Sequence, residues 1–594
     1  MRENIVATNP EQPVGGVAPQ VLREYALLAD GERGALIGPR GEIVWMCVPR
    51  WDSDAVFCAL LGGAGHYAVT PRDPWFVWGG HYEEGSLIWR SRWMRSSGAI
   101  ECRQALAFPG DPHTAVLLRR VQAKDRPAEV LVELDPRADF GRRPLRKPRL
   151  NDGIWTGQLG PLHLRWSGAE QAREIHGRLV LELTVPPGES HDLVLELSDR
   201  PLSDQRRSAE KDWAATENQW KCAVPAMDMA IGRRDARHAY AVLAGLTSVH
   251  GGMVAAATTS LPERGGTGRD YDYRFSWIRD QCFAGQAVAA DGAHRLLDTA
   301  VDFVANRLLA DGPSLQPAYT VDGGTVPGQR ELPHLVGYPG GTAKVGNHVT
   351  NQFQLDAFGE ALLLFSPATR HDHLDNRHWR AVETAVGAIE KRWGDAGAGV
   401  WELNEERWAH SRLICAAGLR SIAAGASTRQ AAAWDSLADA IVAAATRDCL
   451  HPSGRWQRSP SDERVDSALL LPAIRGALPA NDPRSLATLE AIRSELTEDE
   501  FVYRYRHDQR PLHAAEGAFL LCGFFMALAA QQQGDAVGAR GWFERSRSAC
   551  GPPGLYSEEY DVVQRQLRSN LPQAFVHALM FEAACRLARP WQDQ

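Results

Sequence analysis

The sequence predicts a two-part protein of mixed β and α class, with an N-terminal antiparallel β-sandwich followed by an (α/α)6 toroid. Two observations predict this. Apolar residues recur at every second position from about 20 to 200, and at three- and four-residue spacing from about 233 to 590. Between them, residues 201–232 are polar and compatible with a helix, so we expect a linker helix there. The chain of 594 residues is long enough for several domains.

The N-terminal part is predicted to consist of short strands. Leu179 to Val185 alternate apolar and polar residues, Pro-Pro-Gly-Glu-Ser follows, and Leu193 to Leu197 resume the alternation, which predicts a hairpin. The segments LIGPRGEIVWMCV, HTAVLLRRVQ and AEVLVELD are of the same kind, each bounded by Gly, Pro or Asp. Many short strands at short intervals favour a sandwich.

The C-terminal part is predicted to hold about twelve helices. The segments with helical spacing lie near 234–249, 278–292, 296–310, 350–365, 373–391, 408–424, 428–447, 463–475, 484–496, 516–533, 537–549 and 572–587. No fixed-period repeat links them, which argues against a solenoid. Six helical hairpins can close into a toroid whose loops form a pocket at one end.

Composition and charge exclude several classes of function. Hydrophobic residues make up 44% and charged residues 23%, which is typical of a soluble globular protein. The net charge of -8 offers no basic surface for nucleic acid or anionic membranes. We therefore expect a small-molecule partner. Nothing in the sequence indicates an oligomeric state.

The same survey predicts a cytoplasmic protein without metal or cofactor. The first fifteen residues lack the apolar core of a secretory signal, and the longest apolar run, Ala518 to Ala530, is too short to span a bilayer and predicts a buried helix. The ten cysteines form no C-x-x-C pair and are expected to be reduced core thiols. Two histidine pairs lack the spacing and further ligands of a zinc site: His507 with His513, and His371 with His373.

One segment concentrates chemistry-bearing side chains just ahead of a predicted helix. Asp270 to Asp280 holds three Asp, two Arg, two Tyr and one Trp in eleven positions. A neutral sugar binds through an aromatic face and through charged groups that hydrogen-bond its hydroxyls, and Arg279 with Asp280 fits that use. A capped helix start with a surface ion pair is the alternative.

Two further loops carry carboxylates beside aromatic rings. Glu402 follows Trp401 after a Gly-rich loop, and burial against an indole raises a carboxyl pKa, as a general acid requires. Glu558 and Glu559 lie among tyrosines in a second loop; as neighbours they point in different directions, so at most one easily faces a shared pocket. Solvated loop acids are the alternative in both places. One acid and one base across a sugar would suit glycoside hydrolysis.

These motifs resemble glycoside hydrolase family 15, the glucoamylase-type family, over nearly the whole chain. The opening resembles the family's Y-x-L-I-x-D, G-x-I-D-W and P-R-F-D-S patterns. The ordered matches are Tyr25 to Asp30, Gly41 to Trp45, Pro49 to Ser53, Thr259 to Glu263, Asp272 to Asp280, Val345 to Asn347 with Gln352, Gln354 and Asp356, Glu516 to Phe519, and Pro572 to Phe575.

The resemblance implies inverting, exo-acting hydrolysis of α-glucosides from the non-reducing end, with release of β-glucose. It implies that Glu402 is the general acid and Glu558 the general base, and that their carboxyl groups lie roughly 6.5–9.5 Å apart. Tyr273 matches the residue that helps to hold the attacking water. The remaining matches fix the terminal glucose or flank the acid: Trp277, Arg279, Asp280 and Trp401.

The sequence departs from the family pattern in loops expected to line the outer pocket. Val44 replaces an Asp, Lys344 stands where Arg is expected, and Pro339-Gly340-Gly341 replaces a Gly-Tyr-Arg-Gly type loop. We expect Tyr338 and Lys344 to bind substrate and to set its preference. The leading hypothesis is a glucoamylase-like α-glucosidase acting on oligosaccharides, with a trehalase as the alternative. A noncatalytic carbohydrate-binding descendant is a further alternative, whereas Glu558 argues against an inverting phosphorylase.

Overall fold

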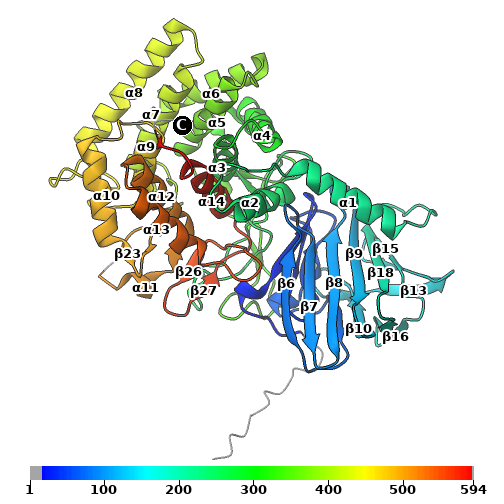
Figure 1. Cartoon of the computed structure of the whole chain (residues 1–594). Coiled ribbons are helices and arrows are strands. Elements are labelled where there is room, and N and C mark those ends of the chain that lie inside the picture. The colour runs from blue at the N-terminus through cyan, green and yellow to red at the C-terminus, as the bar shows by residue number, and fades with distance from the viewer. Residues whose placement is uncertain (1–16, 508, 592–594) are drawn as a thin grey trace, which may run out of the picture.

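The computed structural model describes residues 17–507 and 509–591. It shows a β-sandwich followed by a helical toroid, so the predicted fold class is confirmed (Figure 1). The first fifteen residues, for which the sequence predicts no secretory signal, lie outside the described residues.

The sandwich consists of two antiparallel sheets of eight strands each. The first sheet runs in the order β1 (Ala26–Ala29), β2 (Gly34–Ile37), β3 (Glu42–Cys47), β5 (His66–Pro71), β10 (Ala128–Asp135), β17 (Arg178–Val185) and β16 (Arg173–Ile175), with β4 (Ala55–Phe57) on β3. The second sheet runs in the order β13 (Arg146–Asn151), β14 (Ile154–Leu159), β15 (Leu162–Ser167), β18 (Ser190–Ser198), β9 (Thr114–Ala123), β8 (Gly98–Leu106), β7 (Trp89–Arg95) and β6 (Val77–Tyr82).

Alternation along the strands builds the core between these sheets. In β10, Val130, Val132 and Leu134 are buried, whereas Leu131 and Glu133 between them are only half-buried. Leu117 and Val121 of β9 face the same core from the second sheet. Packing one apolar face of each sheet against the other is the usual way to bury a period-two pattern.

The hairpin predicted at 179–197 is wrong. Strand β17 pairs with β10 and β16 in the first sheet, whereas β18 pairs with β9 and β15 in the second. The turn between them crosses from one sheet to the other, and the Gly188 amide donates to the carbonyls of Ala123 and Lys124 at the end of β9. Alternation shows that one face of a strand is buried, but it does not identify the neighbouring strand.

A helix, α1 (Ala209–Ala223), connects the two parts. The Ser208 side chain caps it by accepting from the Lys211 amide. Its inner face buries Trp213 and Trp220, and the Trp220 ring stacks on Phe108 with centroids 3.9 Å apart. The predicted linker segment therefore contains a helix that packs against the sandwich.

The toroid is built from an inner and an outer layer of helices. Within the described residues, six inner helices contact one another in a closed ring: α3 (Ile278–Ala289), α5 (Asp356–Arg370), α7 (Ala409–Ala423), α9 (Leu471–Ile474), α12 (Leu520–Gln532) and α14 (Ala574–Arg586). The other helices lie outside them: α2 (Arg233–Leu246), α4 (Arg295–Asp311), α6 (Asn376–Arg392), α8 (Thr428–Cys449), α10 (Pro483–Glu495) and α13 (Ala536–Arg547), with a short α11 (Leu512–Ala515).

Each of the twelve predicted helical segments contains a helix, but two differ from the prediction. Segment 463–475 holds only a 3-10 turn, Ser467–Leu470, and the four-residue α9. Segment 516–533 begins as a strand, β25 (Ala518–Phe519), which pairs with β26 (Glu559–Asp561) before α12 starts at Leu520. Apolar residues in this segment fit a buried strand as well as a buried helix, so periodicity alone does not separate them.

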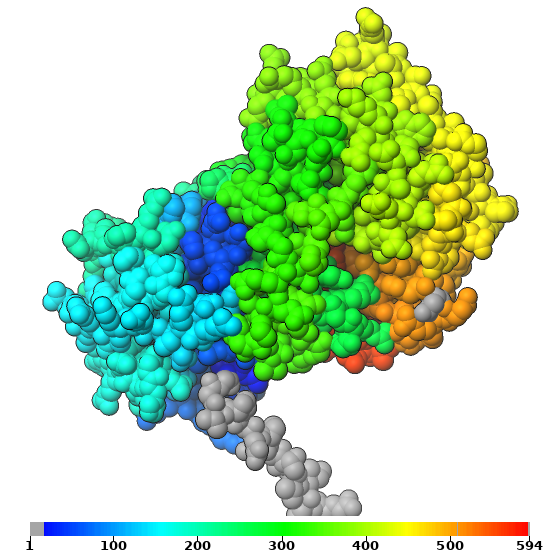
Figure 2. Space-filling view, turned by 180° about the vertical axis from the view of Figure 1, so that it is seen from behind, coloured from blue at the N-terminus to red at the C-terminus, as the bar shows by residue number. Residues whose placement is uncertain are grey.

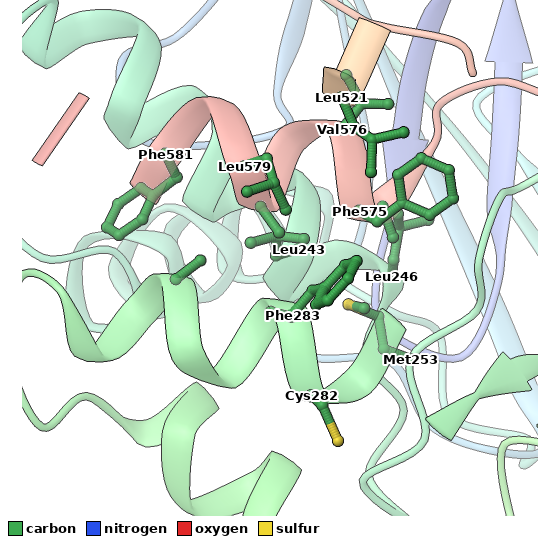
Figure 3. Packing of buried hydrophobic residues seen from close by; sticks show 14 of the residues in the cluster. Leu243, Leu246, Met253, Cys282, Phe283, Leu521, Phe575, Val576, Leu579 and Phe581 are labelled. Carbon is green, nitrogen blue, oxygen red and sulfur yellow. The ribbon is translucent and has the colours of Figure 1, made fainter. Parts of the chain in front are cut away.

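The toroid core explains the longest apolar run. Every residue of α12 from Leu520 to Ala530 is buried, because the helix is surrounded by ring neighbours and by α13. Figure 3 shows Phe283 of α3, Leu521 of α12 and Phe575 of α14 packed with residues of α2. In the described part of the chain, no helix combines the length and hydropathy needed to span a bilayer.

The long connection between α4 and α5 packs against the sandwich. The Gly337 amide donates to the Leu61 carbonyl (2.9 Å), and the Tyr338 hydroxyl donates to the Gln20 carbonyl (2.9 Å). Green residues of this region lie against the blue and cyan sandwich in Figure 2. The sandwich therefore holds a loop that belongs to the toroid.

Candidate active site

The inner helices surround one end of a cavity of about 500 Å³. Its lining comes from the first residues of α3, α12 and α14 and from the loops that precede α5 and α7, so the cavity lies at the N-terminal end of the ring. Seven of the predicted site residues line it: Tyr273, Trp277, Arg279, Asp280, Trp401, Glu402 and Glu558. Predictions drawn from segments up to 285 residues apart thus meet in one place.

Glu402 lies at the tip of a tight loop. The amides of Gly397 and Glu406 each donate to the other's carbonyl and close the loop, and Glu402 itself has a left-handed φ of 55°. Such a conformation is uncommon for a residue with a side chain and costs of order 1–3 kcal/mol, so surrounding contacts must hold it. The loop presents the carboxyl to the cavity.

Three donors converge on one oxygen of this carboxyl. Glu402 Oε1 accepts from Trp277 Nε1 (2.7 Å), Gln354 Nε2 (3.2 Å) and Arg279 Nη2 (3.4 Å). The Glu402 side chain remains 25% exposed to the cavity. One oxygen is fixed by the protein, which leaves Oε2 as the oxygen able to carry a proton toward a ligand.

Trp401 is oriented from behind. Its Nε1 donates to Asp466 Oδ1 (2.8 Å), and its ring meets Phe519 edge-on with centroids 5.3 Å apart. The indole therefore forms a fixed apolar wall beside Glu402.

Glu558 enters the cavity from the loop residue directly before β26. Its Oε2 accepts from the Tyr273 hydroxyl (3.0 Å) and from the Ser569 hydroxyl (3.1 Å). Burial, with the nearby negative charge of Glu263, raises the pKa of Glu558 to about 8. The carboxyl thus binds a proton far more readily than an ordinary glutamate does.

Two aromatic rings stand between the carboxyl groups. Tyr273 bonds to Glu558, Trp277 bonds to Glu402, and the two rings contact each other edge-to-face with centroids 5.7 Å apart. The carboxyls are therefore held by separate side chains of one segment, one on each side of this pair.

Arg279 and Asp280 form a buried charged group beside Glu402. Arg279 lies 3.8 Å from Asp280 and also donates to Gln354 Oε1 (3.2 Å). Burial raises the pKa of Asp280 to about 7, although Arg279 lowers it. Asp280 Oδ1 is buried without a hydrogen-bond partner among the described residues. A buried acceptor of this kind can accept from a ligand that enters the cavity.

Glu559 points away from the cavity. It is fully buried, accepts from the Gly517 amide (2.9 Å), and lies 3.6 Å from Arg504 and 3.9 Å from Arg269. The two neighbouring glutamates point in different directions, and only Glu558 lines the cavity.

Behind Glu558 lies an ionic cluster that combines three further glutamates with two arginines. Arg504 bonds to Glu516 (2.5 Å), and Arg269 pairs with Glu263. Although burial acts to raise it, Arg504 and His507 hold the pKa of Glu516 at about 2. Burial and the neighbouring acids raise the pKa of Glu559 well above its usual range.

Among the other residues of the Asp270 to Asp280 segment, Tyr271 also lines the cavity, whereas Asp272 and Arg274 have a structural role. Asp272 and Arg274 form a buried bidentate pair, and Arg274 Nη1 donates to the carbonyls of Trp51 (3.1 Å) and Ser53 (2.9 Å) in the sandwich. For these two residues the structure agrees better with the alternative of an ion pair at a helix start than with sugar binding. The pair is buried rather than on the surface, and it joins the two domains.

The structure contradicts the expected positions of Tyr338 and Lys344, because neither lines the cavity. Tyr338 is 8% exposed and its hydroxyl bonds to the sandwich. Lys344 Nζ pairs with Asp270 (3.0 Å) and donates to the Gly268 carbonyl (3.2 Å). Val44, another departure from the family pattern, is buried in β3. The loop that carries Tyr338 and Lys344 does reach the cavity, but through Gln329 and His348.

Sequence reasoning gave no role to Ser569, Gln354 or Glu263. Ser569 lies opposite Glu558 because β26 and β27 (Gln566–Arg568) form a hairpin with Glu559 paired to Arg568. The alternation around that turn could have indicated the hairpin. Gln354 and Glu263 belong to matched motifs, but nothing in their spacing shows which carboxylate they approach.

Among the described residues, no cluster of three or more His, Cys, Asp or Glu side chains is arranged to hold a metal ion.

Comparison with known proteins finds similar sequences along most of the chain. The sequence model of the family described as glycosyl hydrolases family 15 matches residues 237–585. A second family model, described as trehalase-like, N-terminal, matches residues 12–220. The chain is 29% identical to the trehalase of Mycolicibacterium smegmatis over 96% of this chain and 92% of that protein. It is also 29% identical to the trehalase of Mycobacterium tuberculosis over 99% of this chain and 92% of that protein.

A solved structure shares the architecture. A bacterial glucoamylase complexed with acarbose superposes with a TM-score of 0.69 at 14% identity, covering 99% of this chain and 98% of the other. At this identity the likeness concerns the fold. With the family model spanning more than half of the chain, and the two carboxylate loops meeting in the ring cavity, the chain belongs to glycoside hydrolase family 15 and is a glycosidase.

Proposed function

We propose that this protein is an inverting trehalase, which hydrolyses α,α-trehalose to two glucose molecules. The observation that carries the hydrolytic part is the meeting of Glu402 and Glu558 in one cavity, each held by a different ring of the Tyr273–Trp277 pair. The choice of trehalose is supported by relatives named trehalase that match nearly the whole chain.

In this proposal Glu402 is the general acid. Trp277, Gln354 and Arg279 fix Oε1, and Oε2 delivers a proton to the glycosidic oxygen as the bond to the anomeric carbon breaks. The leaving glucose thereby departs as a neutral alcohol.

Glu558 is the general base. Its ionised form accepts a proton from a water that attacks the anomeric carbon from the face opposite the leaving group. The Tyr273 and Ser569 hydroxyls both donate to Oε2 and hold that oxygen in place. Inversion requires room for this water, and the predicted carboxyl separation of roughly 6.5–9.5 Å remains a prediction.

Arg279 and Asp280 hold the glucose that is attacked. The unpartnered Oδ1 of Asp280 accepts from a sugar hydroxyl, and Arg279 donates to a neighbouring oxygen. Trp277 and Trp401 supply apolar faces against the ring.

The sequence analysis placed oligosaccharide hydrolysis first and trehalose second, and the named relatives favour the reverse order. The likeness to a glucoamylase lies in the fold and does not favour starch-like substrates. The departures from the family pattern favour neither substrate, because Val44, Lys344 and the Pro339 to Gly341 segment lie outside the cavity lining.

A panel of substrates tests the proposal. Trehalose, maltose, maltotriose and isomaltose are incubated with the purified protein, and the first products are followed by proton NMR. Inversion at one of two α-linked carbons converts that glucose to the β-anomer and leaves the other as α, so trehalose should give equal amounts of both anomers before mutarotation. A higher kcat/KM on maltotriose than on trehalose, or α-glucose alone, would overturn the proposal.

Variants of the three glutamates test the assigned roles. Glu402→Gln and Glu558→Gln should each remove nearly all turnover of a folded protein, because each deletes a proton-transfer group. The matched control is Glu559→Gln, which faces the ionic cluster and should retain most of its kcat. If Glu559→Gln is far more damaging than Glu558→Gln, the assignment of the base is wrong.

A further inference from the structure

The four edge strands of the sandwich differ in how well they are protected against pairing with a further strand. An edge strand exposes unpaired backbone donors and acceptors, and native proteins protect such edges with charges, prolines, bulges or covering groups. Three of the four edges have such protection. The fourth, β6, does not, although it is the last strand of the second sheet, on the side nearer the toroid (Figure 1).

The opposite edge of the same sheet, β13, is protected in several ways. Its sequence, Arg-Lys-Pro-Arg-Leu-Asn, places three cations and a proline on six residues. Its pairing with β14 shifts register between Arg146 and Arg149, which marks a bulge or irregularity. These features prevent a further strand from adding.

The two edges of the first sheet are also protected. Strand β1 is buried, and the Tyr82 hydroxyl bonds to both the amide (2.6 Å) and the carbonyl (2.9 Å) of Leu27. Strand β16 has only three residues, and it carries the exposed charges of Arg173 and Glu174.

Strand β6 has the opposite character. Its sequence, Val-Trp-Gly-Gly-His-Tyr, contains no lysine, acid or proline, and among the described residues it pairs only with β7. The apolar side chains at its start are exposed: Trp75 by 83%, Val77 by 72%, Met94 of β7 by 46% and Trp78 by 38%. The far end of the strand is covered, because Tyr82 packs on His238 of α2.

We propose that β6 is the interface with a second copy of this chain, paired antiparallel about a two-fold axis near Val77. A strand without charge can pair with itself without repulsion, and two-fold symmetry makes one patch serve both copies. An axis near Val77 uses the exposed half of β6 and keeps the covered half, near α2, away from the contact.

The side chains complement one another in this arrangement. Val77 lies opposite Val77 of the second copy, and Trp75 lies opposite Gly79. A side chain at Gly79 would meet no atom within 4 Å, so the space above it is open to an indole. The second sheets of the two copies then form one continuous sheet whose outer edges are the protected β13 strands.

The test is the mass of the full chain in solution, measured by analytical ultracentrifugation over a dilution series. We expect a species containing two copies through β6, and Val77→Lys should halve its mass because it adds like charges at the axis. The matched control is Val537→Lys on α13, a residue 86% exposed, which should leave the mass unchanged. Both variants should retain wild-type activity, because neither residue lines the cavity.

A second measurement keeps the test informative if Val77→Lys does not fold. In a Cys222→Ser background, which removes the one exposed thiol of the described residues, Val77→Cys should cross-link into a covalent pair with oxidised glutathione, and Val537→Cys should not. A wild-type protein that is monomeric at every concentration would overturn the proposal. This holds even if Trp75 of such a monomer binds another ligand. An assembly whose mass Val77→Lys leaves unchanged, or a Val77→Cys chain that does not cross-link, would also overturn it.

Discussion

In the proposed mechanism Glu558 is the base, and a second carboxylate, Glu263, influences the pH range in which it is ionised. A base must be ionised, so kcat/KM should fall as the pH drops through the pKa of Glu558, which burial and Glu263 raise to about 8. Hydrogen bonds from Tyr273 and Ser569 act in the other direction, because they favour the charged form.

Two variants should therefore move the acidic limb of the pH profile in opposite directions. Glu263→Gln removes a negative charge, lowers the pKa of Glu558 and moves the limb to lower pH. Ser569→Ala removes a donor to the carboxylate, raises the pKa and moves the limb to higher pH. The measurement is kcat/KM for trehalose across the pH range in which each variant stays folded. If the acidic limb shifts in the same direction in both variants, the assignment of Glu558 is contradicted.

Asp280 provides a test of how the sugar is held. Asp280→Asn replaces a charged acceptor inside a closed cavity, and losing such a bond costs about 1–3 kcal/mol, or roughly 5- to 150-fold in kcat/KM. The loss should appear for every accepted substrate, because each presents the same terminal glucose. Asp270→Asn is the control: this buried carboxylate pairs with Lys344 outside the cavity, so it should lower Tm and leave kcat/KM within about twofold. Near wild-type efficiency of Asp280→Asn would place the sugar elsewhere.

At the scale of single elements, β3 carries a charge that weakens the sandwich. Glu42 is 2% exposed, and both of its carboxyl oxygens are buried without a hydrogen-bond partner among the described residues. Burial raises its pKa to about 7. The folded protein therefore holds this proton more tightly than the unfolded chain does, and stability falls as the pH rises from the unfolded pKa of 4.5 to the folded value.

Glu42→Gln should remove that dependence. Above pH 7 the variant should be more stable than the wild type by up to about 3 kcal/mol, and near pH 4 the two should have similar Tm values, because both are then uncharged at this position. Thermal unfolding at the two pH values measures the difference. An equal change in Tm at both would show that packing rather than ionisation is responsible.

Most elements could be predicted from the sequence, because their period reflects one buried face. Partners could not be predicted in the same way: β17 and β18 alternate alike, yet the turn between them changes sheet. Likewise, Ala518 and Phe519 continue the apolar pattern of α12 but hydrogen-bond as a strand with β26. Periodicity reports burial, whereas pairing depends on residues far away in the chain.

The candidate site shows the same division. Glu402, Glu558 and the Asp272 to Asp280 segment could be found because each is a dense local motif. Ser569 and Gln354 could not be assigned, since each acts through a carboxylate that the fold brings to it. The expectation that Tyr338 and Lys344 line the cavity was wrong for a related reason. A loop near a cavity need not point its aromatic and charged side chains inward.

At the scale of the whole molecule, one hydrophobic cluster extends across the boundary between the two domains, beside the separate core inside the sandwich. Trp45 and Trp51 of the sandwich belong to the same buried cluster as α2 and α3, and Arg274 donates to sandwich carbonyls. The toroid alone, residues 233–594, would expose this apolar surface to water and leave Arg274 without those acceptors.

We therefore expect residues 233–594 expressed alone to be aggregated or to lack cooperative unfolding. The control is the full chain with Tyr338→Phe, which loses one hydrogen bond between the domains and should stay folded with its order of substrate preference unchanged. Circular dichroism during heating, with binding of a hydrophobic dye, measures both. A soluble toroid with a sharp transition and wild-type activity would contradict the expectation.

The clamp between the sandwich and the α4–α5 connection has a consequence for the divergence of substrate preference. Among the described residues, the sandwich contributes no side chain to the cavity lining, yet it holds the loop through which Gln329 and His348 reach that lining. Two relatives with identical cavity residues can therefore differ in the sugar they accept if their sandwiches seat this loop differently. An alignment restricted to lining positions would group such enzymes together, and changes in the N-terminal third of the chain could alter specificity without altering any residue that touches the substrate.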